Sequence, residues 1–201
     1  MGRAMSAENA DLAFACACGT VSGVIRQAGP REGDHVVCHC RDCRRFATRF
    51  DAGNRVLDDH GGTALYQSRC ARVFFHAGRE KLGCLHLTDK PTLRWYARCC
   101  DTPMFNTYAT GRIPYVTTIL GNCDGARVAD LLGRPIGHLF TAEAPVHPGG
   151  VPEMSMTRLM RRFLGRMARD IVSGDRRRSP LFDPKTLLPI AEPVRVAASV
   201  P

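Results

Sequence analysis

The chain has 201 residues, of which 44% are hydrophobic and 23% are charged, and this is enough to bury one sizeable core. Its 19 glycines and 13 prolines are too few for a low-complexity chain, and no apolar run approaches the roughly 18 residues of a transmembrane helix. These properties exclude a disordered chain and a membrane-spanning protein, whereas the formal net charge of +9 requires that an anionic partner be considered.

Charged side chains interrupt the start of the chain, where a secretory signal needs an apolar region. Glu8 and Asp11 are examples, so we expect a soluble, cytoplasmic protein. Reducing compartments disfavour structural disulfides. Metal binding or catalysis is then the common reason for clusters among the ten cysteines.

Between residues 13 and 120, short apolar or β-branched runs alternate with turn-forming residues. The runs predict strands at residues 34–37, 72–76, 84–87, 93–96 and 115–119. Gly-Gly, Gly-Asn and Asp-Lys-Pro sequences between or after them are typical of antiparallel sheets rather than of βαβ units. We therefore predict a mainly β domain over residues 12–122.

Residues 123–201 are predicted to form a helical and Pro-rich extension packed on that domain. Residues 124–132 have the pattern of a short helix ended by Gly133, and residues 153–172 that of a basic amphipathic helix stopped near Gly174. Five prolines beyond residue 179 favour an extended strap or a mobile end. The predicted apolar face of the longer helix comprises Met156, Leu159, Met160, Phe163, Leu164, Met167 and Ile171.

Seven of the ten cysteines fall into three groups. These are Cys16 with Cys18, then Cys38, Cys40 and Cys43, and finally Cys99 with Cys100. Zinc takes thiolate ligands in a tetrahedron, and closely spaced cysteines supply several ligands at little cost in loop closure. We predict two zinc sites; the alternative is a set of buried, unligated thiols. Single cysteines at 70, 84 and 123 are expected in the core.

Cys38, Cys40 and Cys43 form a natural three-ligand set. A four-ligand zinc site is closed and structural, whereas a three-ligand site keeps a position for water or substrate. Three thiolates around a divalent cation favour a further soft ligand, such as a substrate thiolate. The catalytic candidates are therefore these three cysteines. Nearby arginines at 41, 44 and 45 either offset the charge, hold substrate carboxylates or are simply solvated.

The same segment has two further features that bear on its chemistry. Cys40 and Cys43 form a C-x-x-C pair, but the βαβ context of a thioredoxin-like redox site is missing. His39 lies between ligand cysteines, and we expect it to be packed near the metal rather than bound to it.

The cysteine motifs, in their order, resemble those of the glutathione-dependent formaldehyde-activating enzymes and the related centromere-protein-V domain. That family has C-x-C-G, then C-H-C-x-x-C-R, then a C-x-x-C-G-T-P-like element. The corresponding segments here are Cys16-Ala17-Cys18-Gly19, Cys38-His39-Cys40-Arg41-Asp42-Cys43-Arg44 and Arg98-Cys99-Cys100-Asp101-Thr102-Pro103. The resemblance covers residues from about 14 to 120 and implies a small β-tent fold of antiparallel sheets.

The resemblance also implies ligand roles. Cys16, Cys18 and Cys99 would hold a structural zinc, and the cysteine triplet a catalytic one. The third motif departs from the family pattern, because Tyr96 stands where its first cysteine belongs and Cys100 where glycine is expected. We infer that Cys100 replaces the missing ligand, which adjacent residues can do only with a strained or locally turned backbone.

The implied activity is that of a zinc-dependent carbon–sulfur lyase acting on glutathione-type thiol adducts, with a small-molecule thiol or thiol adduct as partner. The alternative is a non-catalytic, zinc-stabilised module whose basic C-terminal helix binds nucleic acid or another anionic partner. We favour the enzyme, because no base-stacking aromatic residues interleave the arginines of residues 158–178. The sequence gives no oligomeric state.

Overall fold

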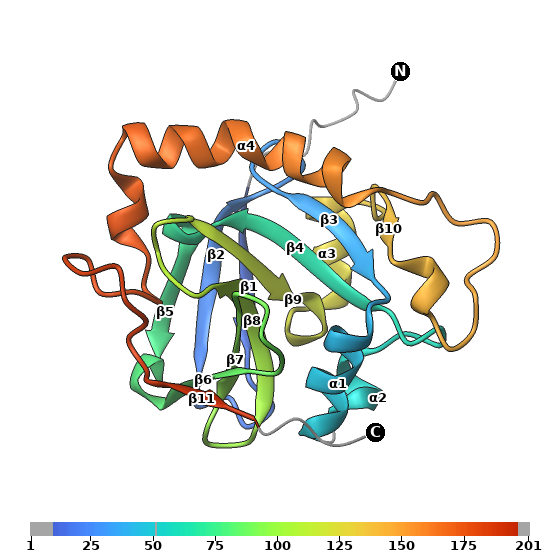
Figure 1. The fold of residues 1–201 in the computed structure, drawn as a ribbon, viewed down its shortest axis with the longest axis horizontal. Coiled ribbons are helices and arrows are strands. Elements are labelled where there is room, and N and C mark those ends of the chain that lie inside the picture. Colours follow the sequence, from blue (N-terminus) through green and yellow to red (C-terminus); the bar gives the residue numbers. More distant parts are fainter. Residues whose placement is uncertain (1–9, 51, 197–201) are drawn as a thin grey trace.

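The computed structural model describes residues 10–50 and 52–196, and its chain forms two β-sheets flanked by helices (Figure 1). The smaller sheet is antiparallel and has three strands. Their order is β1 (Ala10–Ala15), β2 (Ser22–Ala28) and β5 (Val73–Ala77). Residues 1–9, which include part of the segment used to exclude a secretory signal, and 197–201, the end of the predicted extension, lie outside the described residues.

The larger sheet has eight strands and is mixed. Its order is β10 (His138–Leu139), β3 (Asp34–Cys38), β4 (Thr63–Arg69), β9 (Tyr115–Ile119), β8 (Thr102–Tyr108), β7 (Thr92–Ala97), β6 (Leu82–His86) and β11 (Pro193–Arg195). The inner pairs are antiparallel, and both edge pairs are parallel. The mainly β prediction is confirmed. The parallel edge pairs were not predicted. Both edge strands belong to the C-terminal extension and are far in sequence from the strands with which they pair.

The main core lies between the two sheets. Phe14 of β1 contacts Phe105 of β8 with 5.2 Å between ring centroids, and Phe75 of β5 lies 5.8 Å from Phe105. All three contacts within this group are edge-to-face, the arrangement that aromatic rings prefer. Trp95 of β7 is fully buried beside them, and its indole N–H donates to Thr107 Oγ1 at 2.8 Å. The core therefore fixes the two sheets against each other.

Within the described residues, four α-helices and five short 3-10 turns complete the fold. The helices are α1 (Arg41–Arg49), α2 (Gly53–Val56), α3 (Gly125–Leu132) and α4 (Met156–Val172). The turns are η1 (Cys70–Arg72), η2 (Arg79–Lys81), η3 (Leu120–Asn122), η4 (Thr141–Glu143) and η5 (Asp175–Arg178). Asp124 caps α3 by accepting from the Ala126 N–H, and Gly133 ends it with a φ of +67°, as the sequence predicts.

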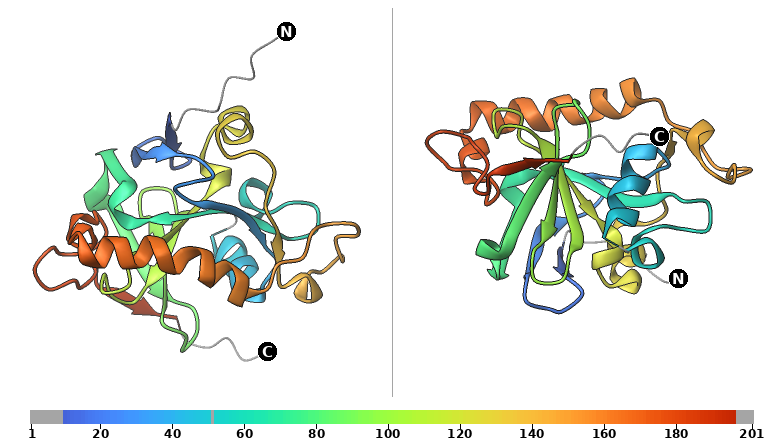
Figure 2. Two further views of the ribbon diagram at one scale, coloured as in Figure 1. Left: turned by 90° about the horizontal axis from the view of Figure 1, so that it is seen from above. Right: turned by 60° about the horizontal axis from the view of Figure 1, so that its bottom comes forward.

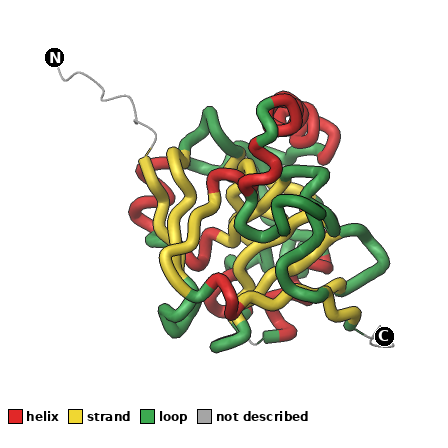
Figure 3. The backbone as a smooth tube through the Cα atoms, turned by 90° about the vertical axis from the view of Figure 1, so that its left-hand side faces the viewer, coloured by secondary structure: helices red, strands yellow, loops and turns green. Residues whose placement is uncertain are grey.

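Helix α4 lies across the sheet edge that carries β3 and β4, as Figure 2 shows from above; Figure 3 views α4 along its axis. Leu159 and Phe163 are buried, whereas Leu164 is 48% exposed, so the buried stripe is narrower than predicted. The reason is that arginines share the packed face. Arg162 and Arg166 both bind the carboxylate of Asp34, whose side chain is fully buried in β3.

The C-terminal tail is partly regular. Beyond residue 179 it forms the edge strand β11, where an extended strap or a mobile end was expected rather than regular structure. Strands β10 and β11 hydrogen-bond to the predicted β domain, and the division at residue 122 remains a prediction. Across the described parts of the chain, no helix has the length and apolar character needed to cross a membrane.

Candidate metal centres

The first candidate centre joins two hairpins from different sheets. Cys16 and Cys18 lie in the turn between β1 and β2, in the smaller sheet. Cys99 and Cys100 lie in the turn between β7 and β8, in the larger sheet. The four thiols come within 4.8 Å of one another, so the structure brings together residues separated by more than 80 positions in the chain.

The sulfur spacing matches that of a tetrahedral metal site. The Sγ atoms of Cys16 and Cys18 are 3.6 Å apart, and those of Cys18 and Cys99 are 3.4 Å apart. The Cys16–Cys99 and Cys99–Cys100 distances are both 3.8 Å. Four thiolates bound at about 2.3 Å in a tetrahedron stand roughly 3.8 Å from each other. The residues therefore fit a metal ion, and Cys100 is placed as a fourth ligand.

Local backbone geometry presents these sulfurs to one point. Gly19 has a φ of +76°, which the tight turn after Cys18 requires and which glycine adopts without strain. The Val21 N–H donates to Cys16 Sγ at 3.2 Å, a bond that favours a thiolate. Asp101 has a φ of +52°, so the chain turns sharply just after the adjacent cysteines. This is the locally turned backbone that the use of adjacent ligands requires.

The four thiols of this cluster differ in pKa. Hydrogen bonding with Thr20 lowers the pKa of Cys18 to about 6. Burial and the contact with Cys18 raise the pKa of Cys99 to about 12. Despite partial burial, hydrogen bonding with Thr102 also lowers the pKa of Cys100, whereas burial raises the pKa of Cys16. Two sulfurs therefore ionise readily and two hold their protons until a cation displaces them, as expected of thiolate ligands.

The second candidate centre lies where β3 passes into α1. Cys38 ends the strand, Cys40 precedes the helix, and Cys43 lies in its first turn, with its N–H donating to the Cys40 carbonyl at 3.1 Å. The three sulfurs come within 4.8 Å of one another, and no fourth Cys, His, Asp or Glu of the described chain joins the group. The positive end of α1 favours thiolates here. The helix itself was not predicted from the sequence.

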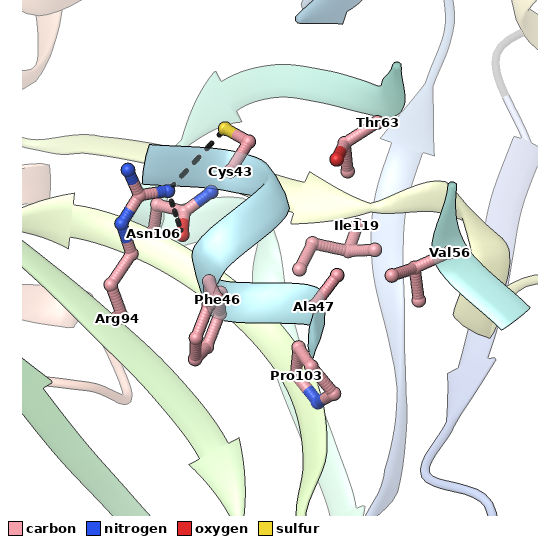
Figure 4. Close-up of a pocket in the computed structure, with 9 residues that line it drawn as sticks. All are labelled: Cys43, Phe46, Ala47, Val56, Thr63, Arg94, Pro103, Asn106 and Ile119. Atoms are coloured by element: carbon pink, nitrogen blue, oxygen red, sulfur yellow. Dashed lines mark hydrogen bonds between the residues drawn. The ribbon is translucent and has the colours of Figure 1, made fainter. Parts of the chain in front are cut away.

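A buried arginine from a distant strand contacts this triplet. Arg94 of β7 is 7% exposed, and its Nη1 donates to Cys43 Sγ at 3.5 Å and to Asn106 Oδ1 at 2.9 Å (Figure 4). Asn106 Nδ2 in turn donates to Thr117 Oγ1 at 2.9 Å. This chain of hydrogen bonds holds the guanidinium against the sulfur. Sequence reasoning missed Arg94; the available signal was a lone charge between apolar residues of a predicted strand.

The arginine and the neighbouring thiols set the ionisation of the triplet. Hydrogen bonds with Cys38 and Cys40, together with the charge of Arg94, hold the pKa of Cys43 well below its usual value despite burial. The same contacts with Cys40 and Cys43, reinforced by burial, raise the pKa of Cys38. Cys43 is therefore the member of the triplet that ionises most readily, and Cys38 and Cys40 hold their protons more firmly.

Access to the triplet is one-sided. A small space behind Cys43, lined by Phe46, Arg94 and Asn106 among others, has no room for the centre of a water molecule (Figure 4). Cys38 and Cys43 are buried, whereas Cys40 is half-buried. A ligand that completes the coordination of a metal here must arrive on the Cys40 side.

The remaining predicted residues have packing roles. His39 is fully buried, and its Nε2 lies 3.0 Å from His138 Nδ1 in a stacked pair, where burial lowers the pKa of both rings. Cys70 and Cys84 are buried and Cys123 is half-buried, and all three lie outside the two clusters. Arg44 donates to the His39 carbonyl oxygen, so it supports the loop rather than the sulfurs.

Comparisons with known proteins give a family and no activity. The model of a family described as "Family of unknown function (DUF6151)" matches residues 9–193. No curated protein matches the chain. A crystal structure of a Rhodobacter sphaeroides protein, a structural genomics target, is similar over 60% of this chain and 98% of its own, with 14% identity and a TM-score of 0.41.

Proposed function

The chain belongs to the DUF6151 family of unknown function, and we propose that it is a zinc-dependent carbon–sulfur lyase acting on adducts of glutathione-type thiols. In this proposal the cluster of Cys16, Cys18, Cys99 and Cys100 holds a structural zinc ion. Cys38, Cys40 and Cys43 hold a second zinc ion, at which the reaction takes place.

The observation that carries the proposal is the contrast between four sulfurs in one cluster and three in the other. Four protein ligands close a tetrahedral site, whereas three leave a position for substrate. All-thiolate donor sets select zinc or other soft metals rather than magnesium or calcium. Bound zinc would supply a Lewis acid that lowers the pKa of a substrate thiol.

The chain's own residues prepare the site for a thiol. Arg94 places a buried positive charge on Cys43 and so offsets the negative charge that three thiolates would accumulate. On α1, Arg45 and Arg49 line a cavity of about 280 Å³ together with Thr48 and Leu87. Their guanidinium groups suit the carboxylates of a glutathione-type substrate. The resemblance of the cysteine motifs to those of glutathione-dependent formaldehyde-activating enzymes supports the same reaction class.

The proposed reaction is an addition and its reverse. The sulfur of the thiol forms a bond to the carbon of formaldehyde, and the thiol proton ends on the former carbonyl oxygen; cleavage reverses both changes. No oxidant or reductant is needed. We place the reaction in the cytoplasm, since all ten cysteines are free and thus suited to a reducing compartment.

The test combines metal content with adduct formation. We expect two zinc ions per chain in reduced protein, falling to one in Cys40→Ser and remaining two in the control Cys123→Ser. Glutathione and formaldehyde are then mixed with each protein, and adduct formation is followed by NMR. Acceleration over the uncatalysed reaction by the wild type and Cys123→Ser, but not by Cys40→Ser, is the expected result.

Two results would contradict the proposal. If Cys40→Ser keeps both zinc ions, the triplet is not a metal site. If two zinc ions bind and no acceleration is seen, both ions are structural and the protein is better described as a zinc-stabilised binding module. Steeply salt-dependent binding of DNA or RNA would then support that alternative.

A further inference from the structure

A strongly basic pocket lies away from both cysteine clusters in the fold. The residues that line it come from α4, η5, β2, β4, η1 and β5. The C-terminal end of α4 lies at the upper left of Figure 1. The volume of the pocket is about 340 Å³. Five arginines line it, and Asp175 is the one acidic residue among the described residues that do so; the arginines are Arg26, Arg69, Arg72, Arg169 and Arg178.

Carboxylates offset only part of this charge. Arg69 is 3% exposed and binds both Asp170 and Asp175, the latter at 2.8 Å. Glu32 accepts from Arg72 at 3.2 Å. These three carboxylates face five guanidinium groups, so the pocket keeps two positive charges. Like charges held together in a concave site attract a counter-ion strongly.

The arginines also have unused hydrogen-bond donors. Arg26 stacks over Phe74, with its guanidinium carbon 4.2 Å from the ring centroid, and has no carboxylate partner among the described residues. Arg169 likewise makes no ion pair there. The Nε of Arg72 is buried without any hydrogen-bond partner. That atom is closed to a ligand, so the donors left for an incoming anion are those of Arg26 and Arg169.

We propose that this pocket binds a dianionic phosphoryl group, either inorganic phosphate or the phosphate of a small phosphomonoester. Two residual positive charges match a dianion, whereas a single carboxylate would leave one uncompensated. Phosphate oxygens accept paired hydrogen bonds from guanidinium groups, which explains why arginines rather than lysines line the site. A volume of about 340 Å³ leaves room for a small organic group beside the phosphate.

The experiment measures the binding of inorganic phosphate and of glycerol 3-phosphate by isothermal titration calorimetry. The test variant, Arg26→Gln/Arg169→Gln, removes the two arginines that have no carboxylate partner, one from β2 and one from α4. The control, Arg158→Gln/Arg161→Gln, removes two exposed charges from α4 outside the pocket. We expect the test variant to bind about tenfold more weakly or worse, and the control to bind within about twofold of the wild type.

A third variant, Arg178→Gln, keeps the proposal testable if the double variant fails to fold. Thermal unfolding is measured for every variant to check that it is folded. Arg178 is 78% exposed, and its removal is expected to weaken binding without lowering stability. Failure of the wild type to bind either probe saturably would overturn the proposal. Equal weakening in the test and control variants would overturn it too, since net charge alone would then explain binding. Binding of a single-stranded oligonucleotide with no binding of either probe would instead indicate a nucleic-acid surface.

Discussion

Replacing Cys99 and Cys100 with serine is expected to remove the metal ion that we propose for the four-cysteine cluster and to destabilise the whole fold. The four-cysteine cluster connects the β1–β2 hairpin to the β7–β8 hairpin. These hairpins belong to different sheets, and Cys16 and Cys99 are 83 positions apart in sequence. Without the metal, this long loop must be closed by the core contacts alone.

The magnitude follows from the entropy of loop closure. A cross-link that closes a loop of about 83 residues stabilises a protein by about 4.5 kcal/mol in the chain-entropy model. For a chain of this size, that corresponds to a fall in Tm of roughly 9–18 °C. The triplet closes a loop of about six residues, and the same reasoning gives about 2 kcal/mol. The two clusters should therefore differ about twofold in their contribution to stability.

The assay is thermal unfolding by circular dichroism of reduced, zinc-loaded protein, with zinc measured in each sample. Cys99→Ser/Cys100→Ser should lose one zinc ion per chain and show the larger fall in Tm, whereas Cys40→Ser should lose one and show the smaller. Cys123→Ser, outside both clusters, is the control for the loss of a thiol. The single variant Cys100→Ser tests the fourth ligand. If the double variant keeps its zinc content and Tm, the proposed cross-link between the hairpins is refuted. If Cys100→Ser alone keeps both, the role of Cys100 as a ligand is refuted.

Three further predictions concern the buried charges. Arg94→Met should raise the pKa of Cys43 and weaken metal binding at the triplet by about 10–100-fold in chelator competition, whereas Arg41→Met, at an exposed position nearby, should not. Asp34→Ala should lower the free energy of unfolding by about 2–4 kcal/mol in urea titrations, because it leaves Arg166 without its carboxylate. Metal uptake by the triplet should release about two protons per ion, so chelator competition should show affinity falling between pH 7 and pH 6.

Sequence patterns predicted the helices and strands whose formation depends on residues close together in the chain. The strand at residues 115–119 and the helix ended by Gly133 follow from periodicity and capping, and both were found. Cysteine spacing likewise predicted the triplet, whereas the meeting of Cys16 and Cys18 with Cys99 was implied only by the resemblance to a known family. The pattern could not show that Arg94 reaches Cys43, because the two are 51 positions apart and meet only through the sheet.

The amphipathic pattern of α4 was misleading for a related reason. Periodicity assigns every apolar side chain to the buried face and every arginine to solvent. In the structure, the buried carboxylate of Asp34 forms ion pairs with Arg162 and Arg166 in the middle of the helix, while Leu164 and Ile171 remain exposed. A buried carboxylate on a distant strand thus decides which face of the helix packs. Two of the arginines that suggested a nucleic-acid surface are engaged within the protein.

The two clusters differ in the stability that they confer, and this difference bears on their roles. A cluster that closes a long loop has a sufficient reason to exist in the stability it confers. The triplet closes a short loop and confers about half as much stability in the same model, yet it sits beside a buried arginine whose desolvation costs free energy. Such an arrangement is poorly explained by stability alone. It is explained if the ion held by Cys38, Cys40 and Cys43 must accept a further, anionic sulfur ligand from outside the chain.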